Sequence, residues 1–155
     1  IHVDHPLLMS LPERLVYRVE AEWDGETGVE VRFKEHPSIR LDMASEFGGL
    51  GRYPCSDETF TSSIAGCVMT TFLYFVRKLQ LKLKSLSVET EMSVDLRGVL
   101  GYRISGVDIR MRIIVPKGEA EKASTCAKLA ERYCHITASI SDCIPIKFNV
   151  EVSET

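Results

Sequence analysis

The chain has 155 residues, of which 45% are hydrophobic and 26% charged, with a formal net charge of −3. This composition favours one globular domain with a sizeable core, and the scattered basic residues argue against a nucleic-acid groove or a membrane-binding basic face. No apolar run approaches the roughly 18 residues of a membrane-spanning helix, and the first residues lack the basic start of a signal peptide. A cytoplasmic protein is therefore expected.

The N-terminal part of the chain predicts a small sheet. After an arm over residues 1–13, apolar residues occupy alternate positions between charged ones over 14–23, which is typical of a half-buried strand. A turn at 24–28 leads to a second strand over 29–33, and a third strand reaches Asp42. Residues 14–43 are therefore expected to form a meander of short strands.

A glycine-rich loop at residues 47–54 separates this meander from the next element. Its glycines suit tight turns. No Gly-Lys-Ser/Thr follows them, as a P-loop requires, and no buried apolar strand precedes them, as a dinucleotide-binding fingerprint requires. The loop is therefore not expected to bind phosphate.

Residues 56–81 predict a long amphipathic helix that carries Cys67. Ser56 is a start signal, and Asp57 and Glu58 lie where the helix dipole favours acidic residues. Cys67 falls on the apolar face, whose members recur at helical spacing: Phe60, Ile64, Val68, Phe72, Val76 and Leu79. Because apolar surroundings disfavour a thiolate, a reactive Cys67 needs a cation from another part of the structure.

Residues 84–115 predict a β-hairpin with one irregularity. Apolar and polar residues alternate along its first strand, glycines turn the chain, and the apolar parity shifts across Ser105-Gly106 in the second strand. A parity shift of this kind predicts a β-bulge.

A second helix is expected over residues 119–134, followed by a last strand over 144–152 that joins the hairpin's sheet. One face of the helix carries small residues, which let two helices approach closely: Ala120, Ala123, Ala127, Ala130 and Cys134. If that face packs on the first helix, the thiols of Cys67 and Cys134 lie near each other in the core.

The remaining cysteines and the histidines point to no separate site. Five cysteines without a Cys-x-x-Cys pair match neither a disulfide-stapled domain nor a zinc module. Cys55, Cys126 and Cys143 are expected to be structural. His135 is interpreted as a surface residue, because neighbours in a helix point about 100° apart. The scattered histidines predict no metal site.

Several of these segments together resemble the OsmC/Ohr family of osmotically inducible and organic hydroperoxide resistance proteins. The resemblance rests on Phe47-Gly48-Gly49, on Ser63-Ile64-Ala65-Gly66-Cys67 and on Ala130-Glu131-Arg132-Tyr133-Cys134, in that order along the chain. It implies a single α+β domain over residues 1–155. In that fold two central helices pack against antiparallel β-sheets, and two chains intertwine as a homodimer.

The resemblance also implies a thiol-dependent peroxidase that defends against oxidative stress. Cys67 would attack a hydroperoxide and become a sulfenic acid, Cys134 would condense with it, and a dithiol reductant such as a lipoylated protein would reopen the disulfide. An apolar pocket lined by residues such as Phe60, Ile64 and Phe72 would favour organic hydroperoxides. No cofactor, metal, nucleic acid or membrane is implied. The alternative is a small-molecule-binding protein of the same fold without turnover.

The residues that would support Cys67 match the family less well. Its peroxidases use an arginine from the turn of the first sheet and an acidic residue ahead of the cysteine helix. The acidic position falls on Asp57, with Glu58 beside it, but residues 24–28 contain no arginine. The substitutes that the sequence offers, each also interpretable as a solvated charge, are Arg18, Arg40 and Arg52. The missing arginine favours the alternative function.

Overall fold

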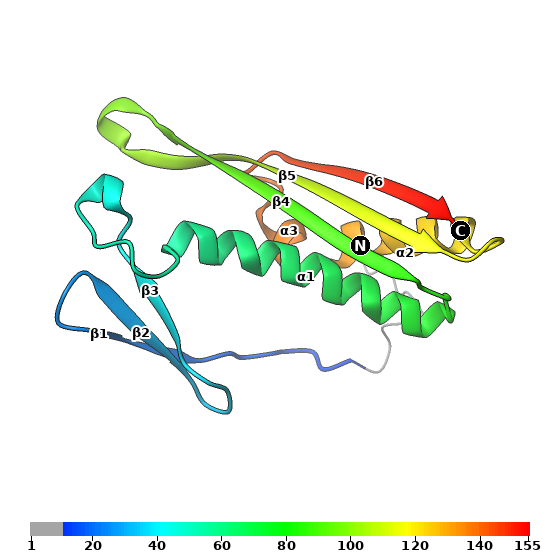
Figure 1. Cartoon of the computed structure of the whole chain (residues 1–155), viewed down its shortest axis with the longest axis horizontal. Helices are drawn as coiled ribbons and strands as arrows, with labels where there is room; N and C mark the ends of the chain where they lie inside the picture. Colours follow the sequence, from blue (N-terminus) through cyan, green and yellow to red (C-terminus); the bar gives the residue numbers. More distant parts are fainter. Residues whose placement is uncertain (1–10) are drawn as a thin grey trace. The chain divides into compact units, whose positions relative to one another are not determined.

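The computed structural model describes residues 11–155 (Figure 1). Most of the predicted N-terminal arm, 1–13, lies outside these residues. Contacts within the chain gather into two compact units, an N-terminal unit up to Thr59 and a C-terminal unit from Phe60 to Thr155. The expectation of a single domain stays a prediction.

The N-terminal unit contains the predicted meander. Strands β1 (Val19–Trp23), β2 (Gly28–Phe33) and β3 (Ile39–Asp42) pair antiparallel in the order β1-β2-β3. The first strand is shorter than its sequence pattern, because residues 14–18 lie outside the sheet. All of β1 is exposed in this chain, so its apolar alternation does not correspond to burial here.

The glycine-rich loop begins with a short 3-10 helix, η2 (Ser45–Phe47), and turns tightly as expected. Gly48 has φ +85°, a backbone conformation that side chains disfavour. A Cβ atom at Gly49 would collide with the backbone carbonyl of Met43, so only glycine allows the close approach of these two segments.

The cysteine helix, α1 (Ser56–Leu79), begins one residue after its cap. The carbonyl of Cys55 accepts the first helical bond, from the N–H of Thr59 at 3.0 Å, and the Glu58 carboxylate accepts the N–H of Cys55 at 3.2 Å. The cap is therefore Cys55 and not Ser56, and Glu58 supplies one of the two bonds of a capping box. The helix ends before the predicted residue 81, because Gln80 adopts φ +53°.

The C-terminal unit contains a second sheet, in the order β4-β5-β6. Strands β4 (Ser85–Leu96) and β5 (Tyr102–Val115) form the predicted hairpin around a 3-10 turn, η3 (Gly98–Leu100). Ser93 pairs with Gly106 and Val94 with Ile104, so Ser105 is the extra residue of a β-bulge. The parity shift in the sequence correctly located this bulge.

The last strand, β6 (Ile146–Glu154), pairs with β5 in parallel. The second sheet is therefore mixed, which corrects the expectation of wholly antiparallel sheets. The reason is the connection between the two strands: helices α2 (Ala120–Tyr133) and α3 (His135–Ile140) carry the chain back to the starting end of β5.

The second helix, expected over residues 119–134, ends at Tyr133, directly before Cys134. This residue has φ −62° and ψ 114°, an extended conformation that ends α2 and precedes α3, which the sequence analysis did not predict. The N–H of Cys134 still bonds the carbonyl of Ala130, and its carbonyl accepts the N–H of Ala138. Cys134 therefore lies at a joint between two helices.

The core of the C-terminal unit is built from one face of each element. Helix α1 contributes a buried stripe, and α2 contributes small residues, as predicted. The rings of Phe75 and Tyr133 lie 5.8 Å apart and join the two helices. The buried side chains are Ile64, Val68, Phe72 and Phe75 from α1, Val107, Ile109, Met111, Ile113 and Val115 from β5, and Ala123, Cys126, Ala127 and Ala130 from α2.

The length and composition of α1 would allow it to cross a membrane, contrary to the expectation that no apolar run is long enough. Core helices of soluble proteins meet the same criterion, so the finding assigns no location.

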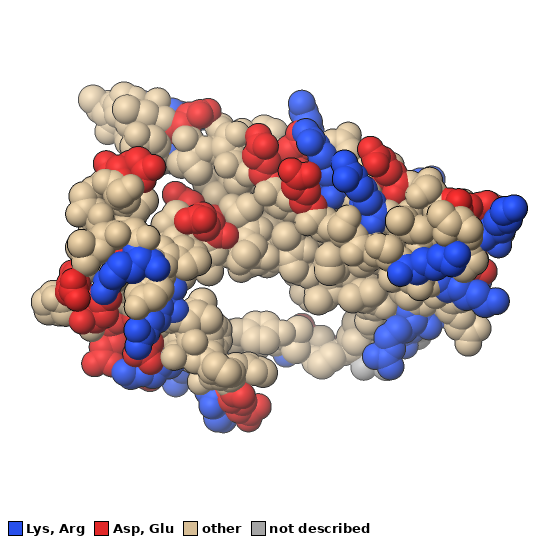
Figure 2. All heavy atoms as spheres, viewed as in Figure 1, with Lys and Arg blue, Asp and Glu red and all other residues tan. Residues whose placement is uncertain are grey.

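Acidic and basic side chains are interspersed over the visible face of the molecule (Figure 2), which agrees with the scattered charges of the sequence.

Candidate active site

Cys67 and Cys134 lie in direct contact in the C-terminal unit. Cys67 is half-buried in the middle of α1, and Cys134 is fully buried at the joint between α2 and α3. Burial raises the pKa of the Cys134 thiol, and the hydrogen bond and charge of Cys67 raise it further. The structure thus brings together the two cysteines that the small-residue face of the second helix predicted to be close.

A threonine accompanies each of these thiols. The side chain and backbone of Thr137 hydrogen-bond Cys134 and oppose the rise in its pKa. Thr71 Oγ1 donates to the carbonyl of Cys67 at 2.7 Å and lies 4.0 Å from the Cys67 sulfur. Neither threonine was expected from the sequence, although each follows its cysteine at a helical spacing, by four and three residues.

The other three cysteines lie in different environments. Cys126 is buried in α2, and burial raises its pKa to about 11, which the charge of Lys122 only partly opposes. Cys55 is the half-buried cap of α1, and Cys143 is exposed. His135 is exposed, as expected. Among residues 11–155, no three histidine, cysteine or acidic side chains gather to hold a metal ion.

Two of the side chains expected to line an apolar pocket belong to the core instead. Ile64 and Phe72 have no exposed surface. They therefore pack the interior of the C-terminal unit and offer no surface to a substrate in this chain.

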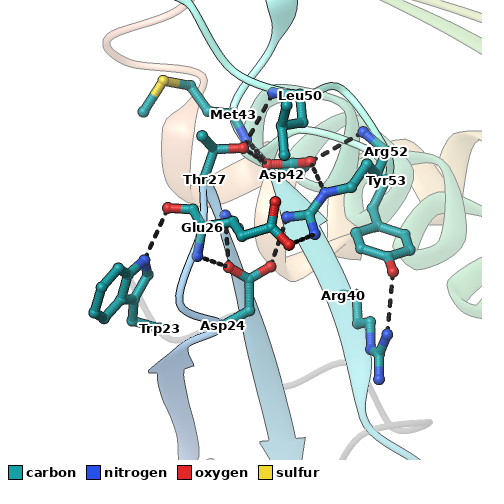
Figure 3. A network of polar contacts seen from close by, with 11 residues as sticks. Trp23, Asp24, Glu26, Thr27, Arg40, Asp42, Met43, Leu50, Arg52 and Tyr53 are labelled. Carbon is teal, nitrogen blue, oxygen red and sulfur yellow. Dashed lines mark hydrogen bonds and ion pairs between the residues drawn. The ribbon is translucent and has the colours of Figure 1, made fainter.

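Arg52 lies at the centre of a polar network in the N-terminal unit (Figure 3). Its Nε donates to Asp42 Oδ2 at 2.7 Å, and its Nη2 donates to Asp24 Oδ2 at 2.6 Å. The Asp42 side chain is fully buried and also accepts the Thr27 hydroxyl at 2.6 Å. Hydrogen bonding to Arg52 holds the pKa of Asp42 well below its usual range. The guanidinium thus lies at the 24–28 turn, although Arg52 belongs to the glycine-rich loop.

The other proposed supporting residues also lie in the N-terminal unit. Arg40 donates to the Tyr53 hydroxyl at 3.1 Å, and Arg18 directly precedes β1 in an exposed position. Glu58 caps α1. Asp57 lines a cavity of about 340 Å³ at the start of that helix. Asp42, the buried partner of Arg52, could not be recognised from the sequence because its contacts are tertiary.

Comparison with known proteins identifies the family. A family model described as OsmC-like protein matches residues 49–149. None of the curated proteins searched matches. An organic hydroperoxide resistance protein OsmC from Legionella pneumophila has a similar structure, with TM-score 0.70 and 21% identity over 90% of this chain and 100% of that one. An OsmC-like protein from Mycoplasma pneumoniae gives TM-score 0.77 and 15% identity over 90% and 99%.

A third structure, an organic hydroperoxide resistance protein from Elizabethkingia anophelis, gives TM-score 0.71 and 15% identity, covering 90% of this chain and 99% of that one. At these identities the structures establish the α+β fold alone. The family model, by contrast, matches more than half of the sequence. The chain therefore belongs to the family of OsmC-like proteins.

Proposed function

We propose that the protein is a thiol-dependent peroxidase that reduces organic hydroperoxides in the defence against oxidative stress. The observation that carries this proposal is the contact between Cys67 and Cys134. The names of the Legionella and Elizabethkingia proteins, which refer to organic hydroperoxide resistance, support the same chemistry. The different burial of the two thiols suggests their roles: half-buried Cys67 meets the substrate, and fully buried Cys134 reacts second.

In the first step, the thiolate of Cys67 attacks the terminal oxygen of the hydroperoxide. The O–O bond breaks, the alkoxide leaves and takes up a proton to become the alcohol, and Cys67 becomes a sulfenic acid. The sulfur of Cys134 then attacks the sulfur of Cys67, a disulfide forms, and the hydroxyl leaves as water with the proton of Cys134. Because the two thiols are already in contact, this second step requires little movement.

A dithiol returns the enzyme to its reduced state. One thiolate of the reductant attacks the disulfide, and its second thiol closes the reductant's own disulfide, which leaves Cys67 and Cys134 as thiols. A lipoylated protein is the reductant that we propose.

We also propose that the protein is a cytoplasmic homodimer. Exposed apolar side chains on the first sheet, Val19 and Trp23 among them, support a partner chain there.

Arg52 is the cation that we propose in place of the arginine missing from the 24–28 turn. Its guanidinium lies at that turn, held by Asp24 and Asp42. Asp42 rather than Asp57 or Glu58 then orients the arginine, since Glu58 already caps α1. Arg18 and Arg40 have no comparable pair of carboxylate contacts in the described part of the chain.

One observation favours the second candidate function, a small-molecule-binding protein of the same fold without turnover. The charge of Arg52 is compensated by two carboxylates at 2.6 and 2.7 Å. A guanidinium neutralised in this way attracts a thiolate less strongly than an unpaired one would.

Steady-state turnover separates the two functions. Reduced protein is mixed with cumene hydroperoxide and dihydrolipoamide, and consumption of the peroxide is followed. The wild type and Cys126→Ser are expected to turn over, because Cys126 is a buried cysteine outside the proposed pair, whereas Cys67→Ser is expected to be inactive. Equal peroxide consumption with and without Cys67, or none by the wild type, would rule out the peroxidase.

A further inference from the structure

We propose that the hydroxyl of Thr71 is a hydrogen-bond donor that stabilises the Cys67 thiolate and holds its sulfur in place. The inference rests on the proposed function and adds a residue to its site. Thr71 lies one turn after Cys67 on α1 and is half-buried on the same side of the helix. Its Oγ1 is 2.7 Å from the Cys67 carbonyl oxygen and 4.0 Å from the Cys67 sulfur.

The two contacts of Thr71 compete for one proton. With Cys67 as a neutral thiol, the carbonyl oxygen is the better acceptor, and the short distance to it agrees with that. A thiolate carries a full negative charge, and hydrogen bonds to ionised acceptors are about twice as strong as those between neutral groups. When Cys67 ionises, rotation of the hydroxyl redirects its proton from the carbonyl to the sulfur, without any movement of the backbone.

A threonine bonded to the carbonyl four residues earlier is common in helices and has no function by itself. The chain provides its own comparison in Thr70, whose hydroxyl donates to the same carbonyl at 3.3 Å but which is exposed to solvent. Water competes for the hydroxyl of Thr70, whereas the half-buried Thr71 lies beside the sulfur.

The neighbouring thiol shows the same arrangement. Cys134, a titratable group in contact with Cys67, receives hydrogen bonds from the side chain and backbone of Thr137 that lower its pKa, against the effect of burial. A threonine hydroxyl therefore lies near each of the two sulfurs within the C-terminal unit. This support is available to Cys67 whatever the charge on Arg52 contributes.

The test is the pH dependence of Cys67 alkylation by iodoacetamide in the reduced full-length protein. Thr71→Val keeps the branched shape and removes the hydroxyl, Thr71→Ser restores a hydroxyl, and Thr70→Val is the matched control. Labelling is read by mass spectrometry. The tryptic peptide 53–77 also contains Cys55, so fragment ions must locate the label.

Thr71→Val is expected to slow alkylation at neutral pH by about 3- to 10-fold, a shift of up to about one pH unit in the profile, with the same limiting rate at high pH. Thr71→Ser and Thr70→Val are expected to follow the wild type. A Thr71→Val profile that superimposes on the wild type, or an equal shift in Thr70→Val, would overturn the proposal. Thr71→Ala removes the hydroxyl without branching and replaces the valine variant if that variant does not fold.

Peroxide turnover distinguishes failure of this inference from failure of the proposed function. If Cys67 is required for turnover but the Thr71→Val profile is unchanged, the peroxidase stands and the role of Thr71 is refuted. If the profile shifts but the wild type consumes no hydroperoxide, Thr71 stabilises the thiolate of a protein that is not a peroxidase.

Discussion

Replacing Cys134 by serine tests the proposed division of labour between the two cysteines. In the wild type, the sulfenic acid on Cys67 is expected to be captured by Cys134 as a disulfide, with no oxygen retained. In Cys134→Ser the sulfenic acid has no thiol partner, and excess hydroperoxide is expected to convert it to sulfinic and then sulfonic acid. One turnover is retained, and continuous turnover is lost.

Cys126, the other cysteine of the second helix, is not expected to replace Cys134. Cys126 lies eight residues earlier, about 12 Å along the axis at 1.5 Å per residue. A disulfide requires Cα atoms within about 7 Å. Burial also raises the pKa of Cys126 from 9.0 to about 11, which leaves about 100-fold less thiolate at neutral pH. Cys126 therefore lies well away from the Cys134 sulfur that contacts Cys67, and its small thiolate population further disfavours capture of the sulfenic acid.

The assay is intact-mass and peptide analysis of reduced protein, at low concentration, during titration with cumene hydroperoxide. Cys126→Ser is the control and is expected to form the same disulfide as the wild type. The reasoning would be refuted if Cys134→Ser formed an intramolecular disulfide from Cys67 to Cys126, or if its Cys67 resisted overoxidation as well as the wild type does.

Two further predictions concern stability. The lowered pKa of Asp42 means that its contribution to folding is present above about pH 4, the unfolded value, and is lost as the pH falls below it. Trp23, the single tryptophan, reports on the same unit. Arg52→Ala should move the acid unfolding transition, followed by Trp23 fluorescence, to higher pH. An unchanged transition would contradict the stabilising role of the Arg52–Asp42 ion pair. Gly49→Ala should lower the urea midpoint of unfolding, because the new Cβ would collide with the Met43 backbone. Gly66→Ala should raise the free energy of unfolding by about 0.5–1 kcal/mol, because α1 has open space at that position. Equal effects of the two substitutions would contradict the close approach of Gly49 to Met43.

Much of the fold could be predicted because it depends on local periodicity. Alternation located the strands, and the parity shift at Ser105-Gly106 located the bulge, since one inserted residue reverses the faces of a strand. Helical spacing placed Cys67 on the apolar face of the first helix and Cys134 at the end of the small-residue face of the second, and the two side chains are in contact. These features are visible in the sequence because neighbouring residues produce them.

Features that depend on tertiary contacts could not be predicted in this way. The short helix α3 that follows Cys134 has no glycine or proline signal at its start. The parallel pairing of β6 follows from the path of α2 and α3 rather than from its own alternation. Arg52 reaches the 24–28 turn from another loop, so the sequence offered it only as one of three possible substitutes, beside Arg18 and Arg40.

The most direct test of the central claim is the location of the disulfide after oxidation by one equivalent of organic hydroperoxide. The proposed function predicts a linked pair of tryptic peptides, 53–77 and 133–147, with fragment ions that place the bond between Cys67 and Cys134. Each peptide contains a second cysteine, so the Cys55→Ser and Cys143→Ser variants should give the same link. A bond that maps to Cys55 or Cys143, or peptides that remain unlinked while Cys67 is unmodified, would contradict the claim.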